Sequence, residues 1–280
     1  MIKKLPLILL VVLFSCKAQD KVKGSRNVKT EQHNLTSFHS IQAKGEFQIG
    51  ILKGSRPLIE IKADDNIHDL IQTEVIDGIL YIKPIKELSR TKSQELKITF
   101  SDTLKNILIS GKVELESLQD LYVGDFQLET RQDSKAFLTL TAGTFNLVQN
   151  DDSKTELNLT ASEVVYQLNQ SSKVEALVNT PSFKVDIYEK ASARIDGEIQ
   201  EFIIRADQSS KFDGENLTSI KTNVLAQGNS EIKLNVTDSL EVRANGKSDI
   251  EVFNNPKIDL IEFKDEAVIS KKEFSKGLFK

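Results

Sequence analysis

The sequence predicts an all-β protein: a parallel β-helix, or β-solenoid, with rungs of about 19 residues and a β-rich cap at its N-terminal end. Three observations predict this fold. Apolar and polar residues alternate through most of the chain, with the two-residue period of a strand. Beyond residue 110, a polar corner recurs at nearly constant spacing. With 39 % hydrophobic and 28 % charged residues, the composition is that of a folded body.

Residues 1–15 are predicted to form a secretory signal peptide. Lys3 and Lys4 supply a short positive start, and residues 5–14 form an apolar run. A run of about ten residues is too short to span roughly 30 Å of hydrocarbon. We therefore expect it to be removed by cleavage.

Cys16, the single cysteine of the chain, directly follows this apolar run. The ending Leu13-Phe14-Ser15-Cys16 resembles a bacterial lipobox. This resemblance implies cleavage before Cys16 and a diacylglycerol on its sulfur, with a further acyl chain on the new N-terminus. Two or three acyl chains hold a protein firmly in a bilayer, whereas one holds it only marginally. We expect a lipid-anchored envelope protein, in the outer membrane. The alternative is ordinary cleavage that leaves a free thiol.

Residues 16–34 are predicted to be the lipidated cysteine and a flexible tether, because residues 17–34 are polar and rich in Lys, Gln and Asn. Lipoproteins that are exported to the cell surface tend to carry an acidic cluster just after the cysteine, whereas the segment Lys17–Lys21 holds one acid. This lack of resemblance favours an anchor that faces the periplasm over one that faces the cell surface. The orientation stays open on this observation.

Residues 35–110 are predicted to form an N-terminal β region. The alternating runs that predict its strands are residues 38–52, 57–63, 79–85 and 95–101. Asp77-Gly78 between two such runs is typical of a hairpin turn. Residues 66–73 are the one stretch with the pattern of a helical turn.

Residues 111–280 are predicted to be the repeat region of the β-helix, continuing the same body. The recurring corner is a serine followed in most cases by a charged residue, and its serines are Ser134, Ser153, Ser172, Ser192, Ser210, Ser230 and Ser248, with a weaker corner at Glu266-Ala267. Every step from one corner to the next has nearly the same length, which marks an internal repeat. Each step holds two short strands, for example residues 136–141 and 144–150.

A fixed period of about 19 residues is typical of stacked coils, because one coil of this size cannot bury its apolar side alone. An antiparallel sandwich is the alternative, since short strands with frequent turns suit that fold too. The constant pairing of two strands with one corner favours the solenoid. A left-handed helix would need a strict hexapeptide pattern of small aliphatic residues, which is missing, so we expect the right-handed form.

The chain resembles the putative auto-transporter adhesin, head GIN domain family of Bacteroidetes envelope proteins. The resemblance is carried by Arg26-Asn27-Val28 and the phrase FHSIQAKGEFQIGILKG, by residues 59–83, by residues 95–111 and by VFNNPKID at 252–259. It covers nearly all of residues 25–270 and implies a β-helical envelope protein. The corners differ from those of the family, because only 13 glycines are present. We expect Asn, Asp and Ser to form the tight corners instead.

Composition excludes several functions. The formal net charge of −4 argues against a nucleic-acid partner, which would require a basic surface. One cysteine excludes an internal disulfide and a multi-thiolate metal site. The three histidines, His33, His39 and His68, leave little material for a histidine-based catalytic or metal cluster. We expect no catalytic residues, no metal and no cofactor.

Four groups of polar residues are the remaining candidates for chemistry. Acids precede several corners, at Asp133, Asp151-Asp152 and Asp207. They are interpreted as turn caps, with a calcium-binding edge or an acid groove for polysaccharide cleavage as the alternatives. Histidines 33 and 39 share strand parity but are too far apart along an extended chain to form a metal site. Thr103 and Ser239 lie in Asp-Thr-Leu and Asp-Ser-Leu motifs that resemble acceptor sites for O-glycans in exported Bacteroidetes proteins.

The lysine that follows the corner serine at positions 135, 154, 173 and 211 is predicted to form a ladder along one edge. Stacked like charges at about 5 Å are unfavourable without counter-ions, so the ladder has two interpretations. It meets an acidic glycan, or it is a solvated face in which acids lie between the lysines. The second interpretation is favoured.

The predicted function is a non-catalytic, lipid-anchored envelope protein that presents a β-helical surface for adhesion to a glycan or protein ligand. The alternative is a structural or assembly component of the envelope, which would contact another envelope protein or stack end to end. A polysaccharide-acting enzyme is a third and weaker hypothesis. The sequence does not predict the oligomeric state.

Overall fold

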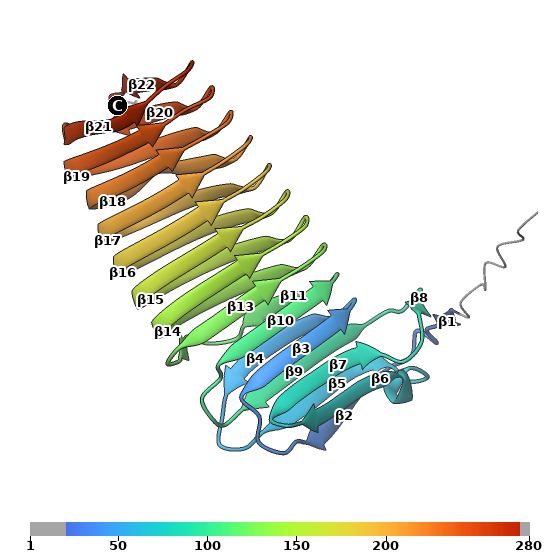
Figure 1. Ribbon diagram of the computed structural model, residues 1–280. Helices are drawn as coiled ribbons and strands as arrows, with labels where there is room; N and C mark the ends of the chain where they lie inside the picture. The colour runs from blue at the N-terminus through green and yellow to red at the C-terminus, as the bar shows by residue number, and fades with distance from the viewer. Residues whose placement is uncertain (1–20, 275–280) are drawn as a thin grey trace, which may run out of the picture.

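The computed structural model describes residues 21–274 and contains a long parallel β-solenoid joined to an N-terminal cap (Figure 1). Within these residues the one helical segment is the short 3₁₀ helix η1 (His68–Leu70), in the stretch with the predicted helical turn. The all-β prediction and the parallel solenoid with its repeating spacing are confirmed. The right-handed sense of the coil stays a prediction. The predicted signal peptide and Cys16 lie outside the described residues.

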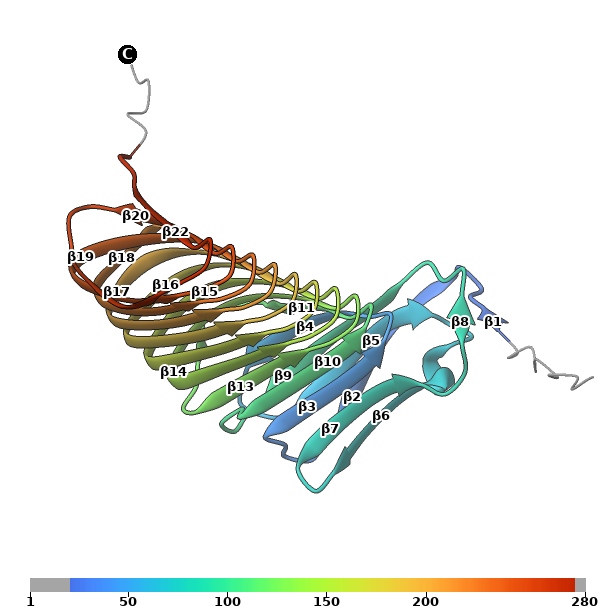
Figure 2. The same ribbon diagram turned by 45° about the horizontal axis from the view of Figure 1, so that its top comes forward.

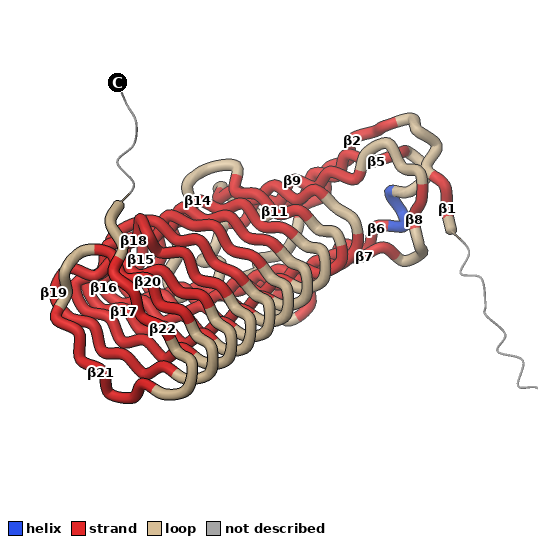
Figure 3. The backbone as a smooth tube through the Cα atoms, turned by 90° about the horizontal axis from the view of Figure 1, so that it is seen from above, coloured by secondary structure: helices blue, strands red, loops and turns tan. Residues whose placement is uncertain are grey.

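The regular part of the solenoid consists of long strands that bend once and pair in parallel with the next rung. They are β14 (Lys135–Gln149), β15 (Lys154–Leu168), β16 (Lys173–Ile187), β17 (Ser192–Ala206), β18 (Lys211–Ala226) and β19 (Glu231–Ala244). The two short strands predicted for each step are the two halves of one such strand. The bend gives the coil two faces, which are joined on the other side by the corner turns (Figure 3).

We call the two sides of the solenoid face A and face B. Face A contains the first halves of β14–β19 together with β4 (Gln48–Lys53), β9 (Gln94–Phe100), β11 (Glu114–Ser117), β20 (Asp249–Phe253) and β22 (Val268–Lys271). Face B contains the second halves together with β3 (Ser40–Gly45), β7 (Ile79–Pro84), β10 (Asn106–Gly111), β13 (Phe126–Thr130) and β21 (Lys257–Phe263). A two-residue strand, β12 (Leu121–Tyr122), also pairs with β14.

The chain enters the first rungs out of order. It first forms the rung β3–β4, then returns to form the rung β7–β9 beneath it, and finally passes over both to form β10–β11 on the other side of β3–β4. The outer edge of β9 is covered by the antiparallel strand β5 (Leu58–Asp64), and that of β7 by β6 (Ile71–Ile76). Parallel stacking therefore starts well before residue 111. The hairpin predicted at Asp77-Gly78 joins β6 to β7, and both turn residues have positive φ.

The prediction of a flexible tether is wrong for residues 28–34. These residues form strand β2 (Val28–Asn34), which pairs in antiparallel register with β5 along its whole length. A second short strand, β1 (Val22–Lys23), pairs with β8 (Leu88–Ser89). The polar composition of β2 misled the prediction, because an edge strand exposes one edge and much of one face, and so needs few apolar residues.

The corner turns place their serines inside the coil. At the fourth corner, the structure corrects the residue that was predicted to occupy this position. Ser134, Ser153 and Ser172 are fully buried, and the equivalent position of the fourth corner is Ala191, because Ser192 instead pairs with Lys173 on face A. With Ala191 in this column, the step into that corner and the step out of it become equal in length.

The tight corners were expected to be formed by Asn, Asp and Ser. In the structure, Gln, Glu and Gly also have positive φ in these turns. The residues with positive φ form a column with φ near +60°: Gln132, Asp151, Gln170, Glu189, Gln208, Gly228, Gly246 and Asp265. A non-glycine residue in this region costs roughly 1–2 kcal/mol. Hydrogen bonds between successive corners offset that cost. For example, Ser171 N donates to Asp151 O at 3.0 Å and Lys190 N to Gln170 O at 2.8 Å.

Ser172→Ala is expected to change the free energy of unfolding by less than about 0.5 kcal/mol. The Ser172 hydroxyl is buried without a hydrogen-bond partner within the described residues, and alanine occupies the same position in the next corner, at Ala191. Chemical denaturation of the two proteins measures the difference. Ser134→Ala is the matched comparison and should cost more, since the Ser134 hydroxyl donates to Arg131 O at 2.8 Å. Equal losses in both variants would contradict this account of the corner.

Candidate functional site

Face A carries its exposed side chains in straight rows. Residues at alternate positions of a strand point outward, and in-register parallel pairing places them above their equivalents in the next rung. Row 1 contains Lys135, Lys154, Lys173, Ser192 and Lys211. Row 2 contains Glu116, Phe137, Glu156, Glu175 and Arg194. Row 3 contains Thr139, Asn158, Leu177 and Asp196.

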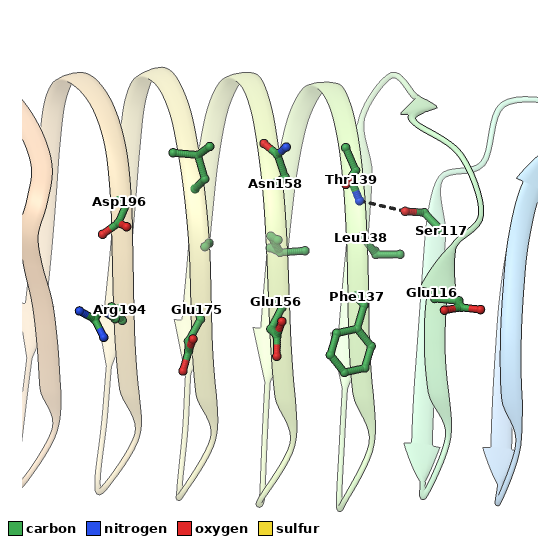
Figure 4. Close-up of a pocket in the computed structure, with 13 residues that line it drawn as sticks. Glu116, Ser117, Phe137, Leu138, Thr139, Glu156, Asn158, Glu175, Arg194 and Asp196 are labelled. Carbon is green, nitrogen blue, oxygen red and sulfur yellow. Dashed lines mark hydrogen bonds between the residues drawn. The ribbon is translucent and has the colours of Figure 1, made fainter.

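Rows 2 and 3 line a shallow open groove of about 590 Å³ across five neighbouring rungs (Figure 4). At one end of row 2, the Phe137 ring is 37 % exposed between the carboxylates of Glu116 and Glu156. At the other end, Arg194 follows Glu175. The groove thus offers one aromatic surface, carboxylate acceptors, a guanidinium donor and the Asn158 amide in a flat array.

The groove is held by the sheet rather than by loops. Every lining residue on β14–β17 belongs to a strand that is paired on both sides. At the edge nearest the cap, the backbone N–H of Thr139 donates to Ser117 Oγ at 2.9 Å, which fixes the end of β11 against β14 (Figure 4). A ligand on this face therefore meets a rigid, repeating surface.

The predicted lysine ladder exists as row 1. Its ends are neutralised, because Lys135 Nζ lies 2.6 Å from Glu114 and Lys211 Nζ lies 2.8 Å from Glu231. Lys154 and Lys173 in the middle have no carboxylate within 4.0 Å among the described residues. Row 1 is therefore cationic beside the largely acidic row 2.

The acids of the groove are arrayed side by side and do not converge. Each carboxylate of row 2 comes from its own rung, and Figure 4 shows them projecting outward in succession. Within residues 21–274, no three His, Cys, Asp or Glu side chains come together in a way that could hold a metal ion. This arrangement suits hydrogen bonding along an extended ligand better than acid–base chemistry at a single bond.

Two of the four acids before the corners accept a hydrogen bond from a turn, Asp151 from the preceding corner and Asp207 from its own, whereas Asp133 and Asp152 accept none within the described residues. Asp151 Oδ2 accepts a hydrogen bond from Gln132 N at 2.8 Å, and Asp207 Oδ1 accepts one from Gln208 N at 2.7 Å. His68 is buried in the cap, where its Nε2 lies 3.1 Å from Lys29 O and 3.2 Å from Ala63 O. It therefore has a structural position rather than a place in the groove.

The two predicted O-glycan acceptors lie in different settings. Thr103 is exposed in the loop between β9 and β10, and Ser239 is half-buried within β19, where it pairs with Lys221 and Lys257. Neither belongs to the groove, and both sites stay predictions.

Sequence reasoning did not single out row 2. The signal that could have found row 2 is its spacing: each member from Phe137 to Arg194 lies two residues after a member of row 1, on the same outward-facing side of the strand.

By fold and exposed face, this chain is a β-solenoid with a polar lateral surface of the kind that repeat proteins use for binding. It belongs to the family described as putative auto-transporter adhesin, head GIN domain, which matches residues 37–256. The resemblance drawn from the sequence is therefore confirmed. None of the curated proteins matches the chain.

The solved structures with a similar fold include three from Parabacteroides species. A protein described as a putative lipid binding protein from Parabacteroides distasonis has a TM-score of 0.65 at 17 % identity, covering 90 % of this chain and 100 % of the other. A putative adhesin from Parabacteroides merdae has a TM-score of 0.61 at 17 % identity, covering 91 % and 98 %. A putative adhesin from Parabacteroides distasonis has a TM-score of 0.60 at 19 % identity, again covering 91 % and 98 %. At these identities the likeness concerns the fold alone.

Proposed function

We propose that this protein is a non-catalytic, lipid-anchored component of the cell envelope that binds an extended glycan along face A. The observation that carries the proposal is the groove of rows 2 and 3, where an exposed aromatic ring lies among regularly spaced hydrogen-bonding groups. The family description as an adhesin supports a role at the cell envelope. Over residues 21–274, the structure has no helix with the length and apolar character to cross a bilayer.

The chemistry of the groove favours a glycan over a folded protein ligand. Sugar rings present an apolar C–H face, which packs on an aromatic ring, and a rim of hydroxyls, which need donors and acceptors. Phe137 supplies the first, and Glu156, Asn158, Glu175 and Arg194 supply the second. The groove is shallow and open to solvent, so it suits an extended strand lying along it rather than a small enclosed molecule.

Phe137→Ala is expected to weaken glycan binding by about tenfold or more, because an aromatic ring in contact with ligand contributes over ~1.4 kcal/mol. Arg194→Gln should weaken it by a smaller factor. Binding is measured on a glycan array and then by calorimetry with the best glycan. Ile203→Ala is the matched control, since Ile203 is a similarly exposed apolar residue on face B at 49 %.

Glycan affinity that is unchanged in Phe137→Ala, or reduced equally by Ile203→Ala, would contradict binding on face A. The bound glycan should also be recovered at its original chain length after prolonged incubation. If the wild-type protein shortens the glycan, and Glu156→Gln or Glu175→Gln does not, the result would instead favour the enzyme hypothesis.

A second candidate function, assembly by end-to-end contact, is favoured by the C-terminal end of the solenoid. Within the described residues β21 pairs only with β19, and β22 only with β20, so both present a free edge. The last rung also exposes five large apolar side chains: Ile258, Leu260, Ile261, Phe263 and Val268. The opposite end is different, because the edge strand β2 carries charged side chains that discourage pairing.

Assembly predicts a sedimentation coefficient that rises with protein concentration. The double substitution Leu260→Ser/Ile261→Ser is expected to abolish the rise, because it removes apolar surface from the exposed rung. Ile203→Ser on face B is the control and should leave it in place. A wild-type protein that sediments as a monomer at all concentrations would exclude this candidate.

A further inference from the structure

The N-terminal segment is fixed to the cap much closer to Cys16 than the sequence predicts. Val22 N donates to Glu87 O at 2.8 Å, and Gly24 N donates to Ser89 O at 3.1 Å, as β1 pairs with β8. This pair lies at the end of the molecule opposite the C-terminal rungs (Figures 1 and 2). Residues 17–21 alone separate Cys16 from the first hydrogen-bonded residue, Val22.

This spacing limits how far the cap can lie from an anchored Cys16. A fully extended chain spans at most about 3.6 Å per residue, so the six steps from Cys16 to Val22 reach no more than about 22 Å. The inference that the cap lies near the membrane rests on the lipid anchor of the proposed function. With that anchor, the end of the cap that carries β1 and β8 is held against the membrane surface, and the solenoid extends away from it.

The same end of the cap is strongly basic. Six exposed cations lie on the two paired segments, residues 21–26 and 86–92: Lys21, Lys23, Arg26, Lys86, Arg90 and Lys92. Lys21 forms an ion pair with Glu87. The charged side-chain nitrogens of the other five have no carboxylate oxygen within 4.0 Å in the part of the chain that the structure describes. Ile85, which directly precedes the second segment, is 58 % exposed.

Three carboxylates next to the two segments are already bound to other groups. Glu87 is engaged by Lys21. Asp64 is fully buried and accepts hydrogen bonds from the backbone N–H groups of Arg26, Lys92 and Ser93. Asp65 is bonded to the side chains of Ser25 and Asn27. Residues 21–26 and 86–92 together hold six cations and one acid, Glu87, so the two segments carry an excess of positive charge, although the whole chain has a net charge of −4. Further acids lie toward the first rungs, where Glu46, Glu95 and Asp133 line hollows together with Glu87 or Lys92.

We infer that this basic end of the cap, residues 21–26 and 86–92, is a docking surface for the anionic headgroups of a phospholipid bilayer. A cation close to an anionic leaflet improves membrane partitioning by about fivefold. The attraction fades beyond a Debye length of roughly 8–10 Å, so it requires the short connection described above. Docking here orients the solenoid away from the bilayer and leaves face A accessible to a ligand.

The experiment uses the mature chain, residues 16–280, with Cys16→Ser to remove the anchor. Co-sedimentation is measured with phosphatidylcholine vesicles and with vesicles in which one third of the lipid is phosphatidylglycerol. We expect binding to the anionic vesicles, little binding to the neutral ones, and release at high salt. Lys23→Gln/Lys92→Gln should weaken the anionic binding by about 25-fold, from two factors of about five.

Lys190→Gln/Lys221→Gln is the matched control. It removes the same charge from two exposed lysines of the solenoid, which also lack ion pairs within residues 21–274. It should leave vesicle binding unchanged. Equal weakening by both double variants would overturn the inference, because it would reflect net charge alone. Equal binding to neutral and anionic vesicles, or binding to neither, would also overturn it. Thermal unfolding of each variant verifies that the fold is intact.

The lipid anchor itself is tested separately in cells. Metabolic labelling with a fatty-acid analogue should mark the wild-type protein and be lost in Cys16→Ala. A missing label in the wild type would contradict the anchor of the proposed function. Vesicle binding of the unlipidated chain would still support the basic docking surface, so the two failures are distinguishable.

Discussion

Phe183→Ala is expected to lower the free energy of unfolding by about 3–5 kcal/mol. Phe183 is 1 % exposed, and its ring lies 4.9 Å from that of Tyr166 and 5.3 Å from that of Phe202, measured between centroids. These rings belong to a continuous interior column that runs from Phe126 to Phe212. A cavity at Phe183 removes contacts with both neighbouring rungs, through Tyr166 on one side and Phe202 on the other. Urea denaturation measures the loss.

Ile203→Ala is the control for this prediction, because Ile203 lies in the next rung but is exposed on face B. It should cost less than about 1 kcal/mol, as is usual for surface substitutions. If both variants unfolded at the same urea concentration, the aromatic column would not be the source of the stability assigned to it.

Asp64→Ala is expected to cost about 3 kcal/mol, since it leaves three backbone N–H groups without their acceptor. Those groups are Arg26 N at 2.7 Å, Lys92 N at 2.9 Å and Ser93 N at 3.2 Å from the carboxylate oxygens. Asp64 thereby joins the N-terminal segment to the loop after β8. Gly24 lies so close that a Cβ there would be 2.2 Å from Asp64 Oδ2. Amide hydrogen exchange of residues 24–27 should accelerate in the variant.

The contribution of Asp64 should depend on pH. Burial acts to raise the pKa of this carboxyl, but the hydrogen bonds from the backbone of Arg26, Lys92 and Ser93 outweigh burial and hold the pKa below its ordinary value of 3.8. A lowered folded-state pKa stabilises the protein at any pH above the ordinary value. This stabilisation is lost as the pH falls through the folded-state pKa. Asp64→Asn should show a smaller loss of stability in that acid range, and an identical pH profile would contradict this assignment.

Much of the fold was predictable because it is repetitive. Residues such as Lys154, Glu156 and Asn158 alternate with buried neighbours, and the same alternation returns after each corner, so period and strand polarity follow from local pattern. The lysine column of row 1 followed from the same spacing. The register at Ala191 did not, because Ser192 beside it matched the corner pattern equally well. Only one of these two neighbouring residues can face the interior, so the packing of the coil decides which of them occupies the corner position.

The cap was less predictable, for a different reason. Strands β3, β7 and β10 look alike in sequence, and their spatial order depends on pairings between residues far apart in the chain. The edge strand β2 has so few apolar residues that composition alone predicted a tether. Row 2 was missed because Phe137, Glu175 and Arg194 share no chemical type; they form one surface only when the rungs are stacked.

The sequence by itself determined the all-β class, the period of the repeat and the membership of residues in outward or inward sets, because each depends on neighbours along the chain. Tertiary structure alone decided which rung lies beneath which, that residues 28–34 belong to the sheet, and that side chains one coil apart along the chain form one groove. These features depend on hydrogen bonds and packing between segments that are distant in the chain. The local pattern of apolar and polar residues does not specify which distant strand will pair with a given strand edge.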